Sequence, residues 1–442
     1  MKRRLLIILA LILVAAAGCT TRGAEEGRTV LNYTRWGNPA ELDSTRELMA
    51  EFMQENPDII VRVDVVSWQE YWQKMATATL TGTAQDVWLL SPAYTEQYAA
   101  AGHLMDLMPF IEADETFDVD DYFPLAFDDF SYTGEGLDMR PVPFGEGALY
   151  AFTRDYNFGL LYYNKDHFDA AGVDYPTEDW TWDDLVEAAK ELTKDFNGNG
   201  IVDQWGAYGI DYTALVAASG GRTIDVENRR GNFVPRDDCS LVYDAIQFCH
   251  DLIHVHGVSP SPSIQLEGDA FVTGKASMTM AGVWHIRNFN RSKSLWDIAS
   301  VPLKSKDTER MRVPGGVAHG IYSRTRHPDE AWRLVKFLSD ETSQRELARS
   351  GTSVPVLKSA VYSDDFLAPF DRPAESSYEI LYDNMIVTAH RPRFIRGYLE
   401  FTREARQQLQ QVWLGYLTPM EGCRRMDSTI DRIVAEQYGG RP

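Results

Sequence analysis

Apolar residues alternate between strand-like and helix-like spacing from residue 29 to residue 101. The expected order is strand, helix, strand, helix, strand and helix, over residues 29–36, 41–55, 59–67, 68–81, 86–91 and 92–101. Alternation of this kind predicts a mostly parallel sheet covered by helices. Ligands of such sheets bind beyond the carboxyl ends of the strands. Those ends lie here at residues 34–38, 67–69 and 91–94, and each carries an aromatic residue.

The middle of the chain interrupts this pattern and then resumes it. Residues 106–141 are acidic and rich in Phe and Tyr, and strand character returns in VPFGEGALYAFTRDYNFGLLYYNK. This return predicts a hinge crossing between two units. Thr181 is expected to cap a helix that begins at Trp182, and helices and short strands then alternate to about Ile298. The last hundred residues are chiefly helical in pattern.

The first residues differ sharply from the rest of the chain. Three basic residues, Lys2 to Arg4, precede thirteen apolar residues from Leu5 to Ala17. A membrane-spanning helix needs about 20 apolar residues, so this run is too short to span and predicts a signal peptide over residues 1–18. Ala16, Ala17 and Gly18 before Cys19 resemble a bacterial lipobox, which makes Cys19 the lipidated first residue and residues 19–28 a flexible tether. The alternative is a plain signal peptide followed by a chance cysteine.

Length and charge narrow the class of protein. The 442 residues are 44% apolar and 24% charged, which is typical of a globular protein and long enough for two large lobes or roughly three smaller units. Acidic residues outnumber basic ones by 65 to 43, so the formal net charge is −22. Such a charge repels a phosphate backbone or an anionic membrane surface, and no nucleic-acid partner is expected.

The cysteines indicate neither a redox enzyme nor a zinc site. Besides Cys19 the chain has Cys239, Cys249 and Cys423, with no CxxC pair, and no HExxH pattern occurs. Cys239 and Cys249 lie ten residues apart along one expected helix, about 15 Å from each other, whereas a disulfide needs Cα atoms within about 7 Å. We therefore do not expect that bridge.

Six segments together resemble one known family. They are, in chain order, WQEYWQKMATATLTGTAQDVWLL, GLLYYNKDHFDAAG, WTWDDLVEAAKELT, FVTGKASMTMAGVWHI, SVPL and GGVAHGIYS. This ordered set is similar to the family 1 extracellular solute-binding proteins, the maltose-binding-like lipoproteins of bacterial ABC importers. The resemblance runs from about Thr29 to the final helices. Ala84 and Gln85 depart from the family pattern, in which a Pro commonly precedes the Asp found here as Asp86.

The resemblance implies a fold, a location and partners. It implies an α/β, two-lobed periplasmic-binding-protein fold (type II-like) with the ligand cleft between the lobes. We expect residues 29–145 and 299–340 in lobe 1, and residues 146–298 and 341–442 in lobe 2. The implied function is capture of a sugar or oligosaccharide outside the cytoplasm and delivery to a membrane permease. A monomer anchored only through its lipid is expected, with no cofactor needed for function.

Sugar recognition needs flat aromatic plates and fixed polar partners, because sugars present an apolar face and a rim of hydroxyl groups. The expected plates follow strands or lie in turns: Trp36, Trp68, Tyr212 and Trp284. The expected polar or close-approach positions are Asn38, Ser91, Asn157, Asp211, Gly316 and His319. Burial in a lobe core is the alternative for each tryptophan. Asp86 is expected to form local hydrogen bonds instead.

A separate segment, DFNGNGIVD, resembles an EF-hand-type calcium loop. Asp195, Asn197, Asn199, Ile201 and Asp203 occupy positions 1, 3, 5, 7 and 9, with glycine at position 6. Oxygen ligands at alternating positions suit a hard cation. Position 12 is Gly206 rather than Glu. The alternatives are a structural calcium site and a simple turn rich in Asn and Gly.

Two rival functions use the same features. Acidic surfaces, aromatic plates and paired carboxylates also describe glycoside hydrolases, and the adjacent acidic pairs are Asp128 with Asp129 and Asp364 with Asp365. Neighbouring acidic residues of this kind are more typical of solvated loops, so we expect no enzyme activity. A peptide or polyol receptor on the same scaffold is the second rival. Spacing alone selects neither the sugar nor the permease.

Overall fold

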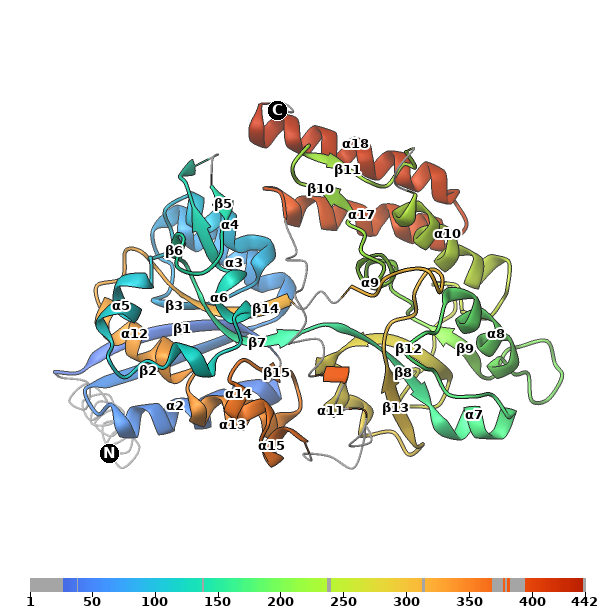
Figure 1. The fold of residues 1–442 in the computed structure, drawn as a ribbon, viewed down its shortest axis with the longest axis horizontal. Coiled ribbons are helices and arrows are strands. Elements are labelled where there is room, and N and C mark those ends of the chain that lie inside the picture. The colour runs from blue at the N-terminus through green and yellow to red at the C-terminus, as the bar shows by residue number, and fades with distance from the viewer. Residues whose placement is uncertain are drawn as a thin grey trace, which may run out of the picture.

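The computed structural model describes residues 27–37, 39–136, 139–236, 240–311, 315–367, 377, 380–381 and 394–439. In these residues the chain forms two α/β lobes, which lie side by side in Figure 1. The predicted two-lobed α/β architecture is confirmed. The predicted signal peptide, Cys19, most of the tether, Asn38 and Cys239 lie outside the described residues.

Lobe 1 is built on a six-stranded sheet in the order β15-β7-β14-β3-β1-β2. β1 is parallel to β2 and β3, as the sequence predicts, whereas β14 is antiparallel to β3 and β7. The sheet is therefore mixed rather than mostly parallel, because β14 returns from the second lobe and runs against β3. The strands are β1 (Thr29–Trp36), β2 (Ile59–Val66), β3 (Val87–Leu90), β7 (Phe152–Asn157), β14 (Gly315–Ile321) and β15 (Val354–Pro355).

Helices cover both faces of this sheet. Figure 1 shows α3 and α4 on one face and α2 and α13 on the other. Ser67 begins α3 with a capping box, because its side chain accepts from the Glu70 amide while Glu70 reaches back to the Ser67 amide. The helices of lobe 1 are α2 (Pro39–Glu55), α3 (Trp68–Thr81), α4 (Pro92–Ala100), α5 (Met108–Ala113), η1 (Val119–Asp121), α6 (Leu125–Asp128), α12 (Pro328–Phe337), α13 (Glu341–Ser350), α14 (Lys358–Val361) and α15 (Asp364–Leu367). A small sheet, β5-β4-β6, joins β4 (Ser131–Thr133), β5 (Arg140–Pro141) and β6 (Ala148–Leu149).

Lobe 2 is built on a four-stranded sheet in the order β13-β8-β12-β9. Its strands are β8 (Gly159–Asn164), β9 (Trp205–Tyr208), β12 (Ala276–Gly282) and β13 (Trp296–Ala299). Thr181 caps α8 as predicted, with its side chain accepting from the Asp184 amide. The remaining elements are α7 (Lys165–Ala171), α8 (Trp182–Leu192), α9 (Tyr212–Ala218), β10 (Ile224–Asp225), β11 (Arg230–Gly231), α10 (Leu241–His254), η3 (Val283–His285), α11 (Ile286–Phe289), α17 (Tyr398–Trp413) and α18 (Pro419–Tyr438).

The lobe boundaries differ from those expected. The predicted boundary after residue 145 is too early, because β7 pairs with β14 and β15 in the lobe 1 sheet and the chain crosses at Phe158, directly before β8. The predicted boundary after residue 340 is also too early. Val354 and Pro355 of β15 pair with Tyr156 and Asp155 of β7 in the lobe 1 sheet. Both lobe boundaries depend on pairing with strands that are distant in the sequence, and local patterns do not reveal such pairing.

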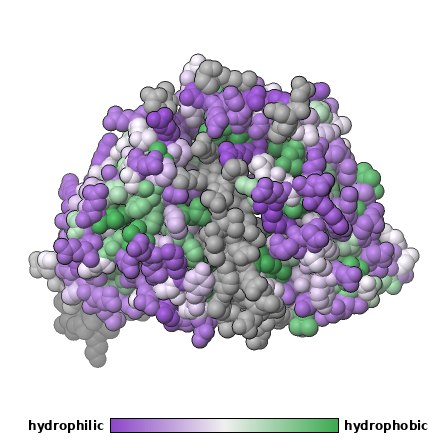
Figure 2. Space-filling model, in the orientation of Figure 1, coloured by the Kyte–Doolittle hydropathy of each residue, from purple (hydrophilic) through white to green (hydrophobic). Residues whose placement is uncertain are grey.

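Figure 2 shows a face that is largely hydrophilic, with hydrophobic side chains gathered in separate patches on both lobes. In the described part of the chain, no helix combines the length and the apolar character that crossing a membrane requires.

Candidate functional site

Aromatic side chains gather where the parallel strands of lobe 1 end. Trp36 is the last residue of β1, and its ring centroid lies 4.8 Å from that of Trp68, 5.2 Å from Tyr71 and 5.7 Å from Trp72. The structure thus brings together the two tryptophans predicted for this lobe. Trp36 is half-buried against the core, whereas Trp68 is 37% exposed at the start of α3. Trp68 is therefore the outer plate of the cluster and Trp36 its inner support.

The loop after β3 adds Ser91 and a tyrosine absent from the predicted site. Tyr94 lies 6.1 Å from the Trp68 ring and 3.9 Å from the Trp72 ring, between centroids. Burial raises the pKa of its hydroxyl to about 12. Ser91 is half-buried and precedes α4 without a side-chain capping bond. The aromatic residue noted in residues 91–94 was the sequence signal for Tyr94.

Two predicted ligand positions on β14 have hydrogen-bond partners within the fold. His319 is fully buried, and its Nε2 lies 2.9 Å from the Tyr33 hydroxyl. Burial, assisted by the nearby guanidinium groups of Arg35 and Arg154, lowers the pKa of His319 well below its ordinary value and keeps the ring neutral. Gly316 is buried too, and its amide donates to Asp129 Oδ2 at 3.2 Å. His319 Nδ1 is buried without a hydrogen-bond partner in the described chain, and the ligand roles of His319 and Gly316 stay predictions.

Asn157 remains a candidate at the hinge. It is the last residue of β7, and its amide nitrogen donates to Asp155 Oδ1 at 2.7 Å. Its own Oδ1 is buried and has no hydrogen-bond partner within the described chain. A buried carbonyl oxygen without a donor is costly, so this atom is a ready acceptor for a ligand hydroxyl.

Trp284 presents a different environment in lobe 2. It lies in η3, directly after β12, and is 53% exposed. The indole lies over Gly282, where an added Cβ would come within 2.1 Å of the ring. Glycine at 282 therefore lets the ring lie flat against the backbone while its other face stays open. As predicted, Trp36 and Trp284 belong to different lobes.

The other predicted pair in lobe 2 is more firmly engaged in the fold. The Asp211 carboxylate accepts from the amide and the hydroxyl of Thr213, both at 2.7 Å, and so caps α9. Tyr212 packs against the core of lobe 2, and burial raises the pKa of its hydroxyl well above the ordinary value. Cys249 and Cys423, near Tyr212, are free buried thiols. The ligand roles of Asp211 and Tyr212 stay predictions.

Three carboxylates of the rival hydrolase interpretation, those of Asp128, Asp129 and Asp365, form hydrogen bonds or ion pairs within the protein. Asp128 accepts from the Phe144 amide at 2.9 Å, and Asp365 pairs with Arg345 and Arg349, both at 3.1 Å. Asp86 accepts from the Asn32 amide at 2.8 Å, so its carboxylate is hydrogen-bonded within the fold, to a strand 54 positions away in sequence. These contacts give the carboxylates a role in stabilising the fold.

The Asn/Gly-rich loop folds around its own polar side chains. The two oxygens of Asp195 accept from the amides of Gly198 at 2.8 Å and Gly200 at 2.7 Å, and these bonds lower the pKa of its carboxyl. Asn199 and Asp203 accept from backbone amides in the same way. Among the described residues, no three His, Cys, Asp or Glu side chains cluster as metal ligands. The side chains of the loop offer only oxygen ligands, from two carboxylates and two amides. Oxygen is the ligand type that calcium prefers, but two carboxylates supply only a modest negative charge.

The fold and the arrangement of the two aromatic sites define a two-lobed binding protein. A family model described as bacterial extracellular solute-binding protein matches residues 36–345. The chain therefore belongs to the family of bacterial extracellular solute-binding proteins.

Individual relatives agree with that family. The chain is similar to an uncharacterised lipoprotein of Streptomyces antibioticus (26% identity over 197 residues, 44% of this chain and 40% of the relative). It is also similar to the arabinooligosaccharide-binding protein of Halalkalibacterium halodurans (24% over 262 residues, 54% of this chain and 55% of the relative), so each match spans about half the relative or less. Among solved structures, an ABC substrate-binding protein of Listeria monocytogenes in complex with cycloalternan has a TM-score of 0.78 and 23% identity, over 92% of this chain and 99% of that one.

Proposed function

We propose that this protein captures a sugar or oligosaccharide between its lobes and delivers it to the membrane permease of an ABC importer. The observation that carries the proposal is the open indole face of Trp284 in lobe 2, with Trp68 and Trp36 at the strand ends of lobe 1. Two aromatic surfaces on separate lobes suit a ligand that is gripped by closure. Two similar proteins support a sugar ligand: the arabinooligosaccharide-binding protein of Halalkalibacterium halodurans and the Listeria monocytogenes protein in complex with cycloalternan.

A thermal-shift screen against a sugar library, followed by calorimetry, tests the proposal. A ligand at 100 times its Kd stabilises the folded form by about 2.7 kcal/mol. We expect at least one saccharide to bind, with the Trp284→Ala variant weakened. Stabilisation by peptides or polyols but by no saccharide would favour a peptide or polyol receptor and contradict the proposal.

The proposal includes binding without catalysis. Incubating the purified protein with a labelled oligosaccharide distinguishes a receptor from a hydrolase, because a hydrolase consumes the label-bearing chain and a receptor only retains it. We expect the recovered oligosaccharide to be intact. Light scattering of the same sample is expected to give the mass of a monomer.

We further propose that Cys19 is lipidated and anchors the protein outside the cytoplasm. The lipobox-like residues before Cys19 support this, as does the lipoprotein name of the Streptomyces relative. Cys19→Ser is expected to yield a protein without lipid that separates from membranes. The same lipidated, membrane-extracted species from Cys19→Ser and from wild type would contradict the anchor.

A structural calcium ion in the loop from Asp195 to Asp203 is a separate proposal. The loop's oxygen donors suit the ion, with Asp195, Asn197, Asn199 and Asp203 as side-chain ligands and the Ile201 carbonyl as the backbone ligand. Gly206 supplies no side chain at position 12, and it is buried where an added Cβ would come within 2.0 Å of the Ala189 carbonyl oxygen. The ion would therefore depend on Asp195 and Asp203 for its charge.

A further inference from the structure

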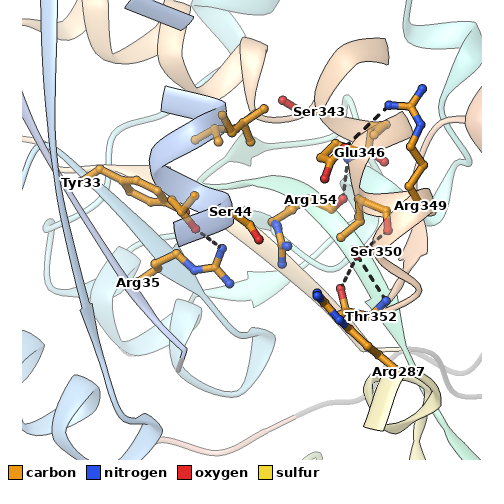
Figure 3. A pocket seen from close by; sticks show the side chains of 15 residues that line it. Tyr33, Arg35, Ser44, Arg154, Arg287, Ser343, Glu346, Arg349, Ser350 and Thr352 are labelled. Carbon is orange, nitrogen blue, oxygen red and sulfur yellow. Dashed lines mark hydrogen bonds and ion pairs between the residues drawn. The ribbon is translucent and has the colours of Figure 1, made fainter. Parts of the chain in front are cut away.

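A cavity rich in arginine lies between α2, α13 and the strand ends of lobe 1. Its volume is about 340 Å³, large enough for a sugar-sized ligand. Four guanidinium groups line it, from Arg35, Arg154, Arg287 and Arg349. Figure 3 shows these side chains around a common space, together with hydroxyl groups of serine and threonine. None of the four arginines is part of the site predicted from the sequence.

The inner wall of the cavity carries buried charge. Arg35 is only 7% exposed and donates to the Thr45 hydroxyl at 3.0 Å, while Arg154 pairs with the fully buried Asp155. Both guanidinium groups act on the Asp155 carboxylate and oppose the rise in its pKa that burial causes. His319 behind them is neutral, as described above. Positive groups are thus held in a partly desolvated wall, where an anion is bound more strongly than at an open surface.

The opposite side of the cavity comes from lobe 2. Arg287 belongs to α11, three residues after Trp284, and its side chain is exposed. It has no hydrogen bond or ion pair to any residue that the structure describes, and Figure 3 shows it beside Thr352 at the edge of the cavity. Arg349 differs, because it pairs with Asp365 at 3.1 Å and so contributes little free charge.

We propose that this cavity binds the carboxylate or phosphate group of an acidic saccharide, an inference that rests on the sugar-binding function proposed above. Guanidinium groups donate two parallel hydrogen bonds to an oxyanion, and the neighbouring hydroxyls donate further ones. Arg287 follows Trp284 by three residues, so lobe 2 supplies both the exposed indole and the free guanidinium group at the cavity, although Trp284 itself does not line the cavity. The protein as a whole carries a formal charge of −22, so local arginines are needed to hold an anionic ligand.

Arg287→Gln tests this inference without disturbing the core, and Arg291→Gln is its matched control. Arg291 is also exposed and lies four residues further on, and its guanidinium group donates to Asn288 Oδ1 at 3.4 Å. Calorimetry at low ionic strength compares galacturonate with galactose, glucuronate with glucose, the corresponding oligosaccharides, glucose 6-phosphate and inorganic phosphate. We expect at least one acidic sugar to bind tenfold or more tightly than its neutral counterpart. We also expect Arg287→Gln, but not Arg291→Gln, to remove most of that preference.

Three results would overturn the inference, and they differ from failure of the proposed function. The first is a result in which neutral sugars bind as tightly as their acidic counterparts. This result would still agree with the proposed function of a sugar receptor. The second is an equal effect of the two arginine variants. The third is binding of inorganic phosphate alone that depends on Arg287, which assigns the cavity to free phosphate rather than to a sugar. Absence of binding by every saccharide, acidic or neutral, would instead contradict the proposed function itself.

Discussion

Trp36 and Trp284 are the same residue type at the end of a strand in their respective lobes, yet their surroundings differ. Lobe 1 packs Trp36 among Trp68, Tyr71 and Trp72, whereas lobe 2 leaves Trp284 53% exposed over a glycine. A similar contrast holds for polar groups, because lobe 1 buries His319 and lobe 2 carries its Asn/Gly-rich loop at the surface. In lobe 1 the candidate site is continuous with the core, so substitutions there affect folding and binding together. In lobe 2 the two effects are separable.

The largest expected effect is on the stability of lobe 1. Trp36→Ala removes a half-buried indole from three ring contacts, so we expect a loss of about 2 to 3 kcal/mol in the free energy of unfolding. Urea denaturation followed by circular dichroism measures it. Unchanged stability would mean that Trp36 is a free plate like Trp284 and would remove the contrast between the lobes.

Trp284→Ala is expected to act on binding alone. Loss of a stacking plate at a binding site commonly costs about 2 kcal/mol, or roughly thirtyfold in affinity for the sugar. Stability should change by no more than about 0.5 kcal/mol, because the ring is exposed. Calorimetry with the saccharide found by screening, together with the urea experiment, measures both quantities. A variant that loses stability as Trp36→Ala does would show that the exposed ring also supports the fold.

Acid is expected to weaken lobe 1 through His319. Its pKa in the folded state lies below the value of 6.5 in an unfolded chain, so protonation favours unfolding. This contribution is complete above pH 6.5 and is lost as the pH falls, by about 1 kcal/mol between pH 7.5 and pH 5.5. Asp340, whose pKa is raised to about 6 by burial, acts in the opposite sense. The readout is therefore the difference between wild type and His319→Gln across this range, and parallel pH profiles would exclude the histidine as the cause.

The smallest expected effect concerns calcium and lobe 2. Calcium added to metal-free protein should raise the Tm by about 2 °C or more, and chelation should reverse it. Asp195→Ala should abolish the difference. Asp179→Ala, an acidic residue outside the loop, is the control that should keep it. If calcium does not change the Tm of the wild type, the loop is a turn rich in Asn and Gly and not a calcium site.

Local patterns predicted much of this fold. Strands at 29–36, 59–66 and 87–90 lie where alternation placed them, and Thr181 starts α8 through the side-chain cap that the sequence predicts. The same patterns placed the lobe boundaries too early. β7 and β15 belong to lobe 1 through pairing between residues about 200 positions apart, for which spacing along the chain carries no signal.

The candidate site was predictable only where it follows from strand ends. Trp36, Trp68 and Trp284 could be proposed because aromatic residues after strands are visible in the sequence. The burial of His319 and Gly316 was not predicted, because a polar or small residue alone does not tell whether a strand position lies inside the sheet core. Arg35, Arg154 and Arg287 were missed, since the fold alone brings these distant positions to one cavity.

A crystal structure of the protein with its saccharide tests the central claim most directly. The account predicts one sugar ring stacked on Trp284 and contacts from the same ligand to Trp68 or Trp36, so that both lobes hold it. A saccharide bound by one lobe only, or at a place remote from these tryptophans, would contradict the account.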